Sequence, residues 1–367
     1  MTVDPPLFGS IALTPAQCAA LKADKADGSD RVVLVAVHPG ELDLDALAHA
    51  LMELRRRHDI LRSTIRYTEH GPVSTVGTRT MLPVELMAER PPRPADGFPP
   101  KRFDLASGPL VHVTLCSDDG GPALLGFQAH AVALDEETMR HLVHELGLLY
   151  RYFASDGPIP PVTQVGYREH AAGVRSTIGR VPKRLPVVSH EVGPAIADRI
   201  RLIASSRGLP VALLVLAAWI ATGSATSAQV AVSLSDPSGR RPLGPARNRI
   251  LVRAEAGSTC DIVTLAEHLH AAAGDGEPDD GITPVSFTFA DGRAGAGPSP
   301  FEVLESSTML ARSDVALAAY GTPAMGWLLR LARHGDIAGR NADRAALART
   351  AAMLEEAGAA LVDEELL

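Results

Sequence analysis

The stretch Pro122–Phe153, PALLGFQAHAVALDEETMRHLVHELGLLYRYF, decides the fold. Its apolar first part predicts a strand, and GPLVHVTLC (Gly108–Cys116) just before it predicts a neighbouring strand. From Asp135 onward, apolar residues recur at helical spacing and predict a helix with one core-facing stripe, made of Met139, Leu142, Val143 and Leu146. A strand that leads through a short turn into an amphipathic helix favours an α/β architecture.

The chain on the N-terminal side of this stretch continues the same alternation. The run RVVLVAVHP (Arg31–Pro39) is rich in β-branched residues and ends in proline, which predicts a strand. Before it, a short helix is expected at Leu13–Ala23, with Thr14 as N-cap and Pro15 at the first helical position. After it, leucines at helical spacing predict an amphipathic helix with a basic end at Arg55–Arg57.

A linker rich in proline and glycine around Asp156–Val162 divides the chain into two predicted parts, residues 1–160 and 161–367. In the second part the sequence predicts helices at Ala195–Arg207, Val211–Thr222, Ile262–Ala273 and Asn341–Leu361. It also predicts strands at Gln229–Leu234, Arg249–Ala254 and Val315–Ala319. The alternation predicts an α/β fold in both parts.

The composition argues against several classes of function. The chain has 367 residues, 35 basic and 43 acidic, with a net charge of −8, and such an acidic balance is unfavourable for binding nucleic acid. Cys18, Cys116 and Cys260 are far apart, so they fit neither a disulfide framework nor a zinc site. The N-terminus lacks a signal-peptide pattern, and the longest apolar stretch, Pro210–Gly223, is too short to span a bilayer. We therefore expect a cytoplasmic protein without membrane contact.

Eight short segments carry motif-like patterns in one fixed order along the chain. They are LTPAQ (Leu13–Gln17), RRRHDILRSTI (Arg55–Ile65), FDLASGPLVHVTL (Phe103–Leu115), QAHAVALDEETMRHLV (Gln128–Val143), YREHA (Tyr167–Ala171), SLSDPSGRR (Ser233–Arg241), ARNRILVRAE (Ala246–Glu255) and SDVALA (Ser313–Ala318). In this order they resemble the motifs of the condensation domains of nonribosomal peptide synthetases, a branch of the chloramphenicol-acetyltransferase-like acyltransferases. The aromatic part of the first motif and a late Asp-Phe-Gly-Trp-Gly motif are missing.

The resemblance implies two chloramphenicol-acetyltransferase-like α/β lobes in a V-shaped pseudo-dimer, with a tunnel between them. It also implies substrates that arrive as thioesters on the phosphopantetheine arms of peptidyl or aminoacyl carrier proteins, with no tightly bound cofactor. Structural support is expected from Arg62, Tyr167 and Arg240. By the same resemblance, Arg62 would form a partly buried ion pair with Asp135.

The family's active-site motif, HHxxxDG, falls on residues 130–136. His130 matches the first histidine and Asp135 the aspartate, but Ala131 replaces the second histidine and Glu136 replaces the glycine. In the family the second histidine faces the tunnel and contacts the attacking amine. An alanine methyl group accepts no proton, and losing a positioned general base typically costs roughly 10²–10⁴ in rate.

The remaining polar residues of the motif leave two interpretations open. Neighbouring side chains on a strand point to opposite faces, so His130 is expected to face into the lobe and bind backbone. A one-residue slip or bulge would instead turn it towards the tunnel, which keeps His130 and Asp135 as catalytic candidates. Glu136 is either a substitute base or a solvated acid at a helix start, where the dipole favours negative charge.

Three other patterns have features of functional sites. His141 and His144 have the spacing of a metal pair but no apparent third ligand, so a solvated helix flank is expected. The glycines of DGRAGAGP do not lie between a strand and a helix and predict a loop. Arg55–Arg57 could bind an acidic carrier protein, although a solvated helix end is the simpler interpretation.

Whether the protein is an enzyme stays open at this stage. The first hypothesis is a free-standing, condensation-like protein that acts in trans on carrier-bound intermediates without histidine-based catalysis. It would hold a peptide or recruit a tailoring enzyme, similar to the domains of glycopeptide synthetases that recruit cytochromes P450 and have the same two motif positions altered. The second is an active acyltransferase that forms amides or esters by positioning alone. A third, an acyl-CoA ester synthase, would need the missing histidine.

Overall fold

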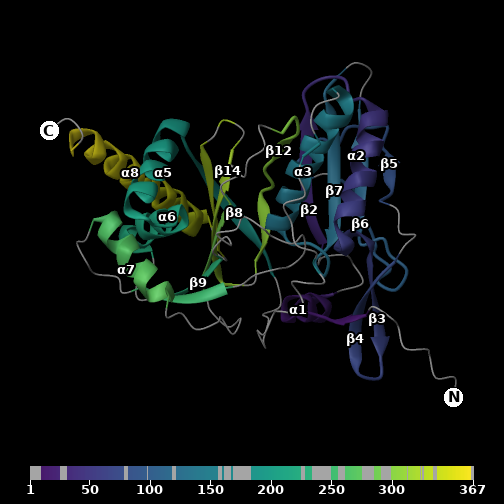
Figure 1. Cartoon of the computed structure of the whole chain (residues 1–367), viewed down its shortest axis with the longest axis horizontal. Helices are drawn as coiled ribbons and strands as arrows, with labels where there is room; N and C mark the ends of the chain where they lie inside the picture. Colours follow the sequence, from purple (N-terminus) through teal and green to yellow (C-terminus); the bar gives the residue numbers. More distant parts are fainter. Residues whose placement is uncertain are drawn as a thin grey trace. The chain divides into compact units, whose positions relative to one another are not determined.

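Figure 1 shows the chain as a computed structural model. The structure describes residues 10–24, 31–77, 82–96, 98–117, 121–155, 159–160, 167, 183–224, 228–233, 249–254, 261–274, 285–290, 299–311, 313–322, 324, 326–333 and 337–364. The chain forms two compact units. The first consists of Met1–Pro182, Asp236–Ala246 and Ala296–Leu310, and the second of Lys183–Ser235, Arg247–Gly295 and Ala311–Leu367. Both contain helices and strands, so the predicted α/β class is confirmed.

The first unit contains a five-stranded sheet with two long helices packed on one face. Its strand order is β12 (Glu302–Leu304), β2 (Arg31–His38), β7 (Ala123–His130), β6 (Val111–Cys116) and β5 (Val84–Leu86). All neighbours are antiparallel except β5 and β6. On β7, alternate residues such as Leu125 and Phe127 share one apolar core with α2 (Leu44–Arg57) and α3 (Glu136–Ser155). The predicted strand, turn and helix are therefore present.

The opposite face of this sheet is covered by the segment that precedes β6. The Phe98 ring packs over Gly126 of β7, where an added Cβ would lie 2.7 Å from the ring. Gln128, fully buried on the same face, donates Nε2–H to the Pro99 carbonyl and accepts the Lys101 N–H. His130 follows Gln128 by two residues and shares this face, because side chains alternate along a strand.

A smaller three-stranded sheet and a short helix complete the described part of the first unit. The strand order is β1 (Ile11–Ala12), β4 (Gly71–Val76) and β3 (Ser63–Thr68), all antiparallel. Helix α1 (Pro15–Ala23) has Thr14 as its N-cap and Pro15 in its first turn, as predicted. The predicted basic helix ends at Arg57 and is followed by a 3-10 turn, η1 (Asp59–Arg62), that leads into β3.

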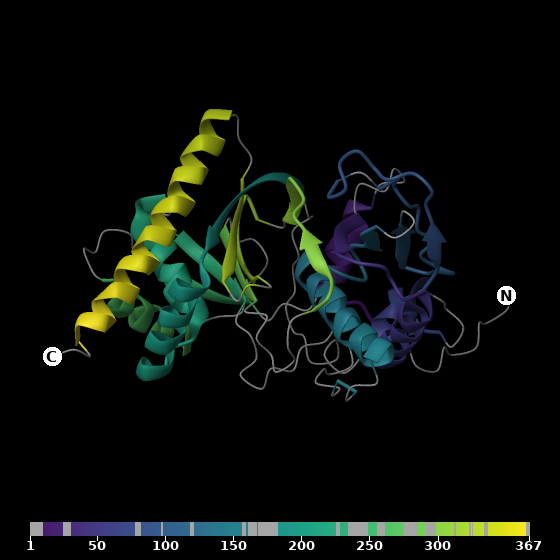
Figure 2. The same ribbon diagram turned by 90° about the horizontal axis from the view of Figure 1, so that it is seen from above.

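The second unit contains a large sheet. Its strand order within the unit is β10 (Arg249–Ala254), β9 (Ala228–Ser233), β11 (Val285–Ala290), β14 (Val315–Gly321), β15 (Trp327–Arg333) and β8 (Lys183–Val192). A further strand, β13 (Thr308–Ala311), spans the boundary in sequence between the two units at Leu310. Figure 1 shows the helices of the second unit on one face of the sheet: α5 (Pro194–Arg207), α6 (Val211–Trp219, continued by η2, Ile220–Ser224), α7 (Ile262–Gly274) and α8 (Ile337–Glu364). Figure 2 shows the long α8 alongside α5 and α6.

The core of the second unit lies between this sheet and these helices. It includes both tryptophans of the chain, Trp219 and Trp327, each 0% exposed. The Arg201 guanidinium lies 5.0 Å from the centre of the Trp327 ring. Within the described part of the chain, no single helix has the length and apolarity to cross a bilayer; the sharply bent pair α5 and α6 passes that test only when counted together.

Candidate functional site

The motif that aligns with HHxxxDG forms a tight turn between β7 and α3. His130 is the last residue of β7, and its carbonyl oxygen accepts the N–H groups of Ala133 (2.9 Å) and Leu134 (3.2 Å). The N–H of His130 continues the strand pairing by donating to the Leu110 carbonyl at 3.0 Å. All four side chains of residues 131–134 are buried.

The Nδ1 atom of the His130 ring accepts a hydrogen bond from the backbone. His130 is 3% exposed, and Nδ1 accepts the backbone N–H of Val132 at 3.1 Å. Nε2 lies 3.4 Å from Oδ1 of Asp24, and the ring meets Phe103 edge-on at 5.7 Å. A neutral imidazole has one donor and one acceptor nitrogen, so the contact at Nδ1 places the proton on Nε2. The expected backbone contact of a buried histidine is therefore present.

Ala131 is the residue that the sequence resemblance aligns with the family's second histidine. Its side chain is 1% exposed and belongs to the apolar core shared by β7, α2 and α3. A methyl group in such surroundings can neither accept nor donate a proton. Ala131 therefore contributes packing to the turn.

Asp135 caps helix α3. Its Oδ1 accepts the N–H of Thr138 at 2.9 Å and the Thr138 hydroxyl at 2.8 Å. Arg62 points elsewhere and donates Nε–H to the Arg55 carbonyl at 3.2 Å. Among the described residues, no ion pair joins Arg62 to Asp135. The pair predicted from the resemblance is therefore not formed. The carboxylate instead satisfies a free N–H at the helix start.

Glu136 is not a solvated acid, as one interpretation had it. Its side chain is 11% exposed and lies 3.3 Å from Nη2 of Arg140. Arg140 in turn makes a two-pronged contact with Glu305, at 2.9 and 2.6 Å, next to β12. Glu136 is therefore part of an ionic group that joins the start of α3 to a late segment of the chain.

Tyr167 lies where two of the motifs meet. Its hydroxyl is 3.1 Å from Oγ1 of Thr14, the N-cap of α1, and its N–H donates to Oδ1 of Asp59 at 2.9 Å. It is 2% exposed, which agrees with a supporting role. Arg240, the third predicted supporting residue, lies outside the described residues.

Sequence reasoning missed two residues that contact the motif turn. The Nε2 of Gln17, from α1, donates to the Val132 carbonyl at 3.1 Å, and Asp24 follows the same helix. The spacing Thr14-x-x-Gln17 is a capping-box signal, and this local role is present. The contact with Val132 spans 115 residues, for which no local pattern exists.

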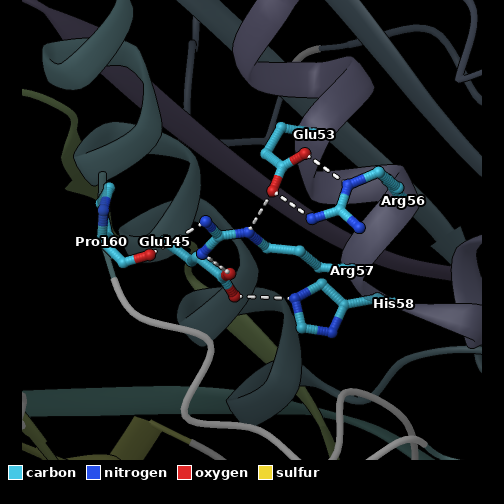
Figure 3. A network of polar contacts seen from close by, with 6 residues as sticks. All are labelled: Glu53, Arg56, Arg57, His58, Glu145 and Pro160. Atoms are coloured by element: carbon cyan, nitrogen blue, oxygen red, sulfur yellow. Dashed lines mark hydrogen bonds and ion pairs between the residues drawn. The ribbon is translucent and has the colours of Figure 1, made fainter. Parts of the chain in front are cut away.

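A buried ionic group lies at the end of α2 (Figure 3). Arg57, 2% exposed, binds Glu53 at 2.8 Å, Glu145 at 3.2 Å and the Pro160 carbonyl at 2.9 Å. His58 contacts the other oxygen of Glu145 at 2.7 Å. The expected solvated helix end is therefore wrong for Arg57. It holds for Arg56, 70% exposed.

The carboxylates of this group are held in their charged form. Burial alone would raise the pKa of Glu145, but the hydrogen bonds and charges of His58 and Arg57 outweigh it, so the pKa is lowered. The hydrogen bonds from Arg56, with that from Arg57, lower the pKa of Glu53 to about 2. Both carboxylates, Glu53 and Glu145, are therefore stabilised in their ionised form.

The two histidines of α3, His141 and His144, favour their neutral form. Burial is the main cause that lowers the pKa of both side chains. The Nε2 of His141 is 4.0 Å from Oε1 of the buried Glu137. No group of three metal-binding side chains occurs among the residues that the structure describes.

Comparisons with known sequences point to one family. Residues 9–179 match the sequence model of the Condensation domain family. Chondramide synthase of Chondromyces crocatus is 30% identical over 131 residues, which cover 33% of this chain and 3% of that protein. Phosphinothricin tripeptide synthetase of Streptomyces viridochromogenes is 33% identical over 154 residues, covering 38% and 13%. The matches thus span only a small part of these relatives' length.

Solved structures share the fold over nearly the whole chain. The first condensation domain of the CDA synthetase superposes with a TM-score of 0.69 at 16% identity, covering 95% of this chain and 97% of that one. The X-domain from teicoplanin biosynthesis superposes with a TM-score of 0.64 at 15% identity, covering 98% and 96%. At such identities the likeness concerns the fold.

Proposed function

We propose that this chain, which belongs to the condensation-domain family of nonribosomal peptide synthetases, binds carrier-bound intermediates without the family's histidine-based catalysis. It would act in trans as a platform, meaning a protein that holds a thioester-linked peptide or recruits a tailoring enzyme to it. Its ligands would be the phosphopantetheine arms of peptidyl or aminoacyl carrier proteins. A cytoplasmic setting remains a prediction from the sequence.

The observation that carries the proposal is the chemistry at residues 130 and 131. Amide formation from a thioester requires an amine to lose a proton, and a positioned base contributes roughly 10²–10⁴ in rate to such a step. Ala131 offers only a buried methyl group at the position of that base. The Nδ1 of His130 is engaged by Val132, and its Nε2 lies beside Asp24. The motif therefore lacks a free imidazole lone pair, in support of binding without catalysis.

The proposal is tested by separating binding from bond formation. The protein is mixed with a pantetheine-linked aminoacyl mimic and with donor and acceptor carrier proteins loaded with aminoacyl thioesters. Binding is followed by NMR chemical-shift changes, and product by mass spectrometry. We expect saturable binding, and product formation no faster than without the protein. The control is each carrier protein without its phosphopantetheine arm, which should bind more weakly.

The same experiment decides against the alternative. An acyltransferase that works by positioning alone would form amide or ester product in proportion to the protein added. Such product would overturn the platform proposal. Failure to bind any loaded carrier protein or the mimic would overturn both functions.

A further inference from the structure

Helix α1 touches the motif turn from both of its ends. Near its start, Gln17 contacts the carbonyl of Val132, and after its end Asp24 lies beside the ring of His130. The ring in turn binds the N–H of Val132. Both polar backbone groups of one residue in the turn, the N–H and the C=O of Val132, are thus bound by residues of α1 or by a ring that α1 contacts.

The contact at the start of α1 is fully buried and uses both ends of an amide. Gln17 is 0% exposed; its Oε1 accepts the Thr14 N–H at 3.1 Å while its Nε2 donates to Val132. The hydroxyl of Thr14 is in turn hydrogen-bonded to the hydroxyl of Tyr167. A buried carbonyl without a donor is costly, so the turn depends on Gln17 to satisfy Val132.

The contact at the end of α1 is electrostatic, because Nε2 of His130 and Oδ1 of Asp24 are close but are not aligned as a hydrogen bond. With Nδ1 accepting from Val132, the Nε2 of His130 carries the proton and faces the carboxylate of Asp24 at 3.4 Å. The hydrogen bond at Nδ1 sets the tautomer, and a carboxylate beside Nε2 favours the ring orientation that keeps the proton on that nitrogen. Asp24 thereby acts on the turn through His130.

We propose that α1 is a brace for the motif turn, with Gln17 and Asp24 as positioning residues and His130 held as the Nε2–H tautomer. The brace fixes the turn that carries Ala131 before any ligand arrives. This inference goes beyond the proposed function, because it concerns the free protein and stands or falls without a carrier-bound substrate.

The first test is the nitrogen spectrum of the His130 ring in the full-length protein labelled with ¹⁵N-histidine, assigned with the variant His130→Gln. We expect an unprotonated Nδ1 and a protonated Nε2 at neutral pH. The opposite tautomer, or an even mixture of the two, would overturn the brace, because neither is compatible with Nδ1 accepting from Val132. This signature does not depend on activity and does not follow from burial alone.

The second test is amide hydrogen exchange of Val132. Gln17→Glu keeps an acceptor for Thr14 but turns a second oxygen towards the Val132 carbonyl. Asp24→Ala removes the negative charge beside His130. We expect each to accelerate exchange of Val132 by about tenfold or more, since an unsatisfied buried group favours local opening. The control is Glu69→Gln, which removes a charge from the exposed turn between β3 and β4. If Val132 exchanges as slowly in both variants as in the wild type, the brace is refuted. Should Gln17→Glu fail to fold, Asp24→Ala alone decides. Asp24→Asn, which keeps an oxygen at this position, should exchange more slowly than Asp24→Ala.

Discussion

Replacing Glu145 with glutamine is expected to destabilise the first unit, because Arg57 and His58 converge on this carboxylate. The three side chains are 12%, 2% and 4% exposed. Removing one member of a buried ion pair costs ~3–5 kcal/mol. Arg57 keeps Glu53 at 2.8 Å, so we expect the lower end, about 3 kcal/mol. For a unit of this size, that corresponds to a fall of roughly 6–12 °C in the unfolding midpoint.

The effect of this substitution should depend on pH with a defined sign. The pKa of Glu145 is lowered in the folded protein, since His58 and Arg57 outweigh the effect of burial. A group with a lowered folded pKa contributes stability above its unfolded pKa, about 4.3 for glutamate. That contribution is lost as the pH falls through the folded pKa. The difference between wild type and E145Q should therefore be full at neutral pH and shrink below about pH 4.

The assay is urea unfolding followed by far-ultraviolet circular dichroism at a series of pH values from neutral to acidic. The matched control is Glu267→Gln, which breaks an exposed pair with Arg207 at 3.8 Å and should cost less than about 1 kcal/mol. A loss in E145Q no larger than in the control would refute the reasoning. So would a difference that persists unchanged in acid, because it would then not come from the charge of Glu145.

Three further substitutions test the packing of the first unit. Ala131→His should lower the free energy of unfolding by ~1–3 kcal/mol, because it places a larger side chain at a position that is 1% exposed. Thermal melting checks this loss. The variant should also form no amide product in the carrier-protein assay. Gly147→Ala should lower the free energy of unfolding by a similar ~1–3 kcal/mol, because a Cβ at residue 147 would collide with the Ser299 side chain. This loss should outweigh the better helix propensity of alanine. Urea unfolding measures the change, and a more stable variant would contradict the close approach of Ser299. Thr14→Ala should lower the free energy of unfolding by ~1–2 kcal/mol, because it removes the N-cap of α1 and the contact with Tyr167. Urea unfolding measures this loss, and a loss below about 0.5 kcal/mol would contradict a stabilising role of both contacts.

The elements that sequence reasoning predicted are those whose signal is local. The apolar run of β7 and the periodic stripe of α3 follow from residues that are neighbours in the chain. Strands β8 and β15 were missed. The first contains Pro186 and charged ends, and the second carries Arg330, which is 0% exposed in the middle of the strand. A polar residue buried by tertiary structure interrupts the pattern from which a strand is predicted.

The site was predicted in outline only. The turn between β7 and α3 follows from local sequence, because the strand and the helix on either side of it have clear patterns. The absence of a catalytic imidazole at residue 131 stays a prediction from the resemblance. Sequence reasoning did not predict that Gln17 and Asp24 would reach the turn, or that Arg57 would be buried against Glu145 of another helix. Each of these contacts joins residues far apart in sequence, and their spacing says nothing about their proximity in space.

The placement of both tryptophans in the second unit makes selectively excited tryptophan fluorescence a reporter of that unit alone. Trp219 and Trp327 are fully buried there, so their emission should be blue-shifted and should move to longer wavelength only when the second core opens. Circular dichroism, in contrast, averages the helices and strands of both units. Comparing the two signals along one denaturation curve therefore measures whether the units unfold as one cooperative system. Coincident curves mean that they do, and separate midpoints assign a stability to each unit without any engineered label.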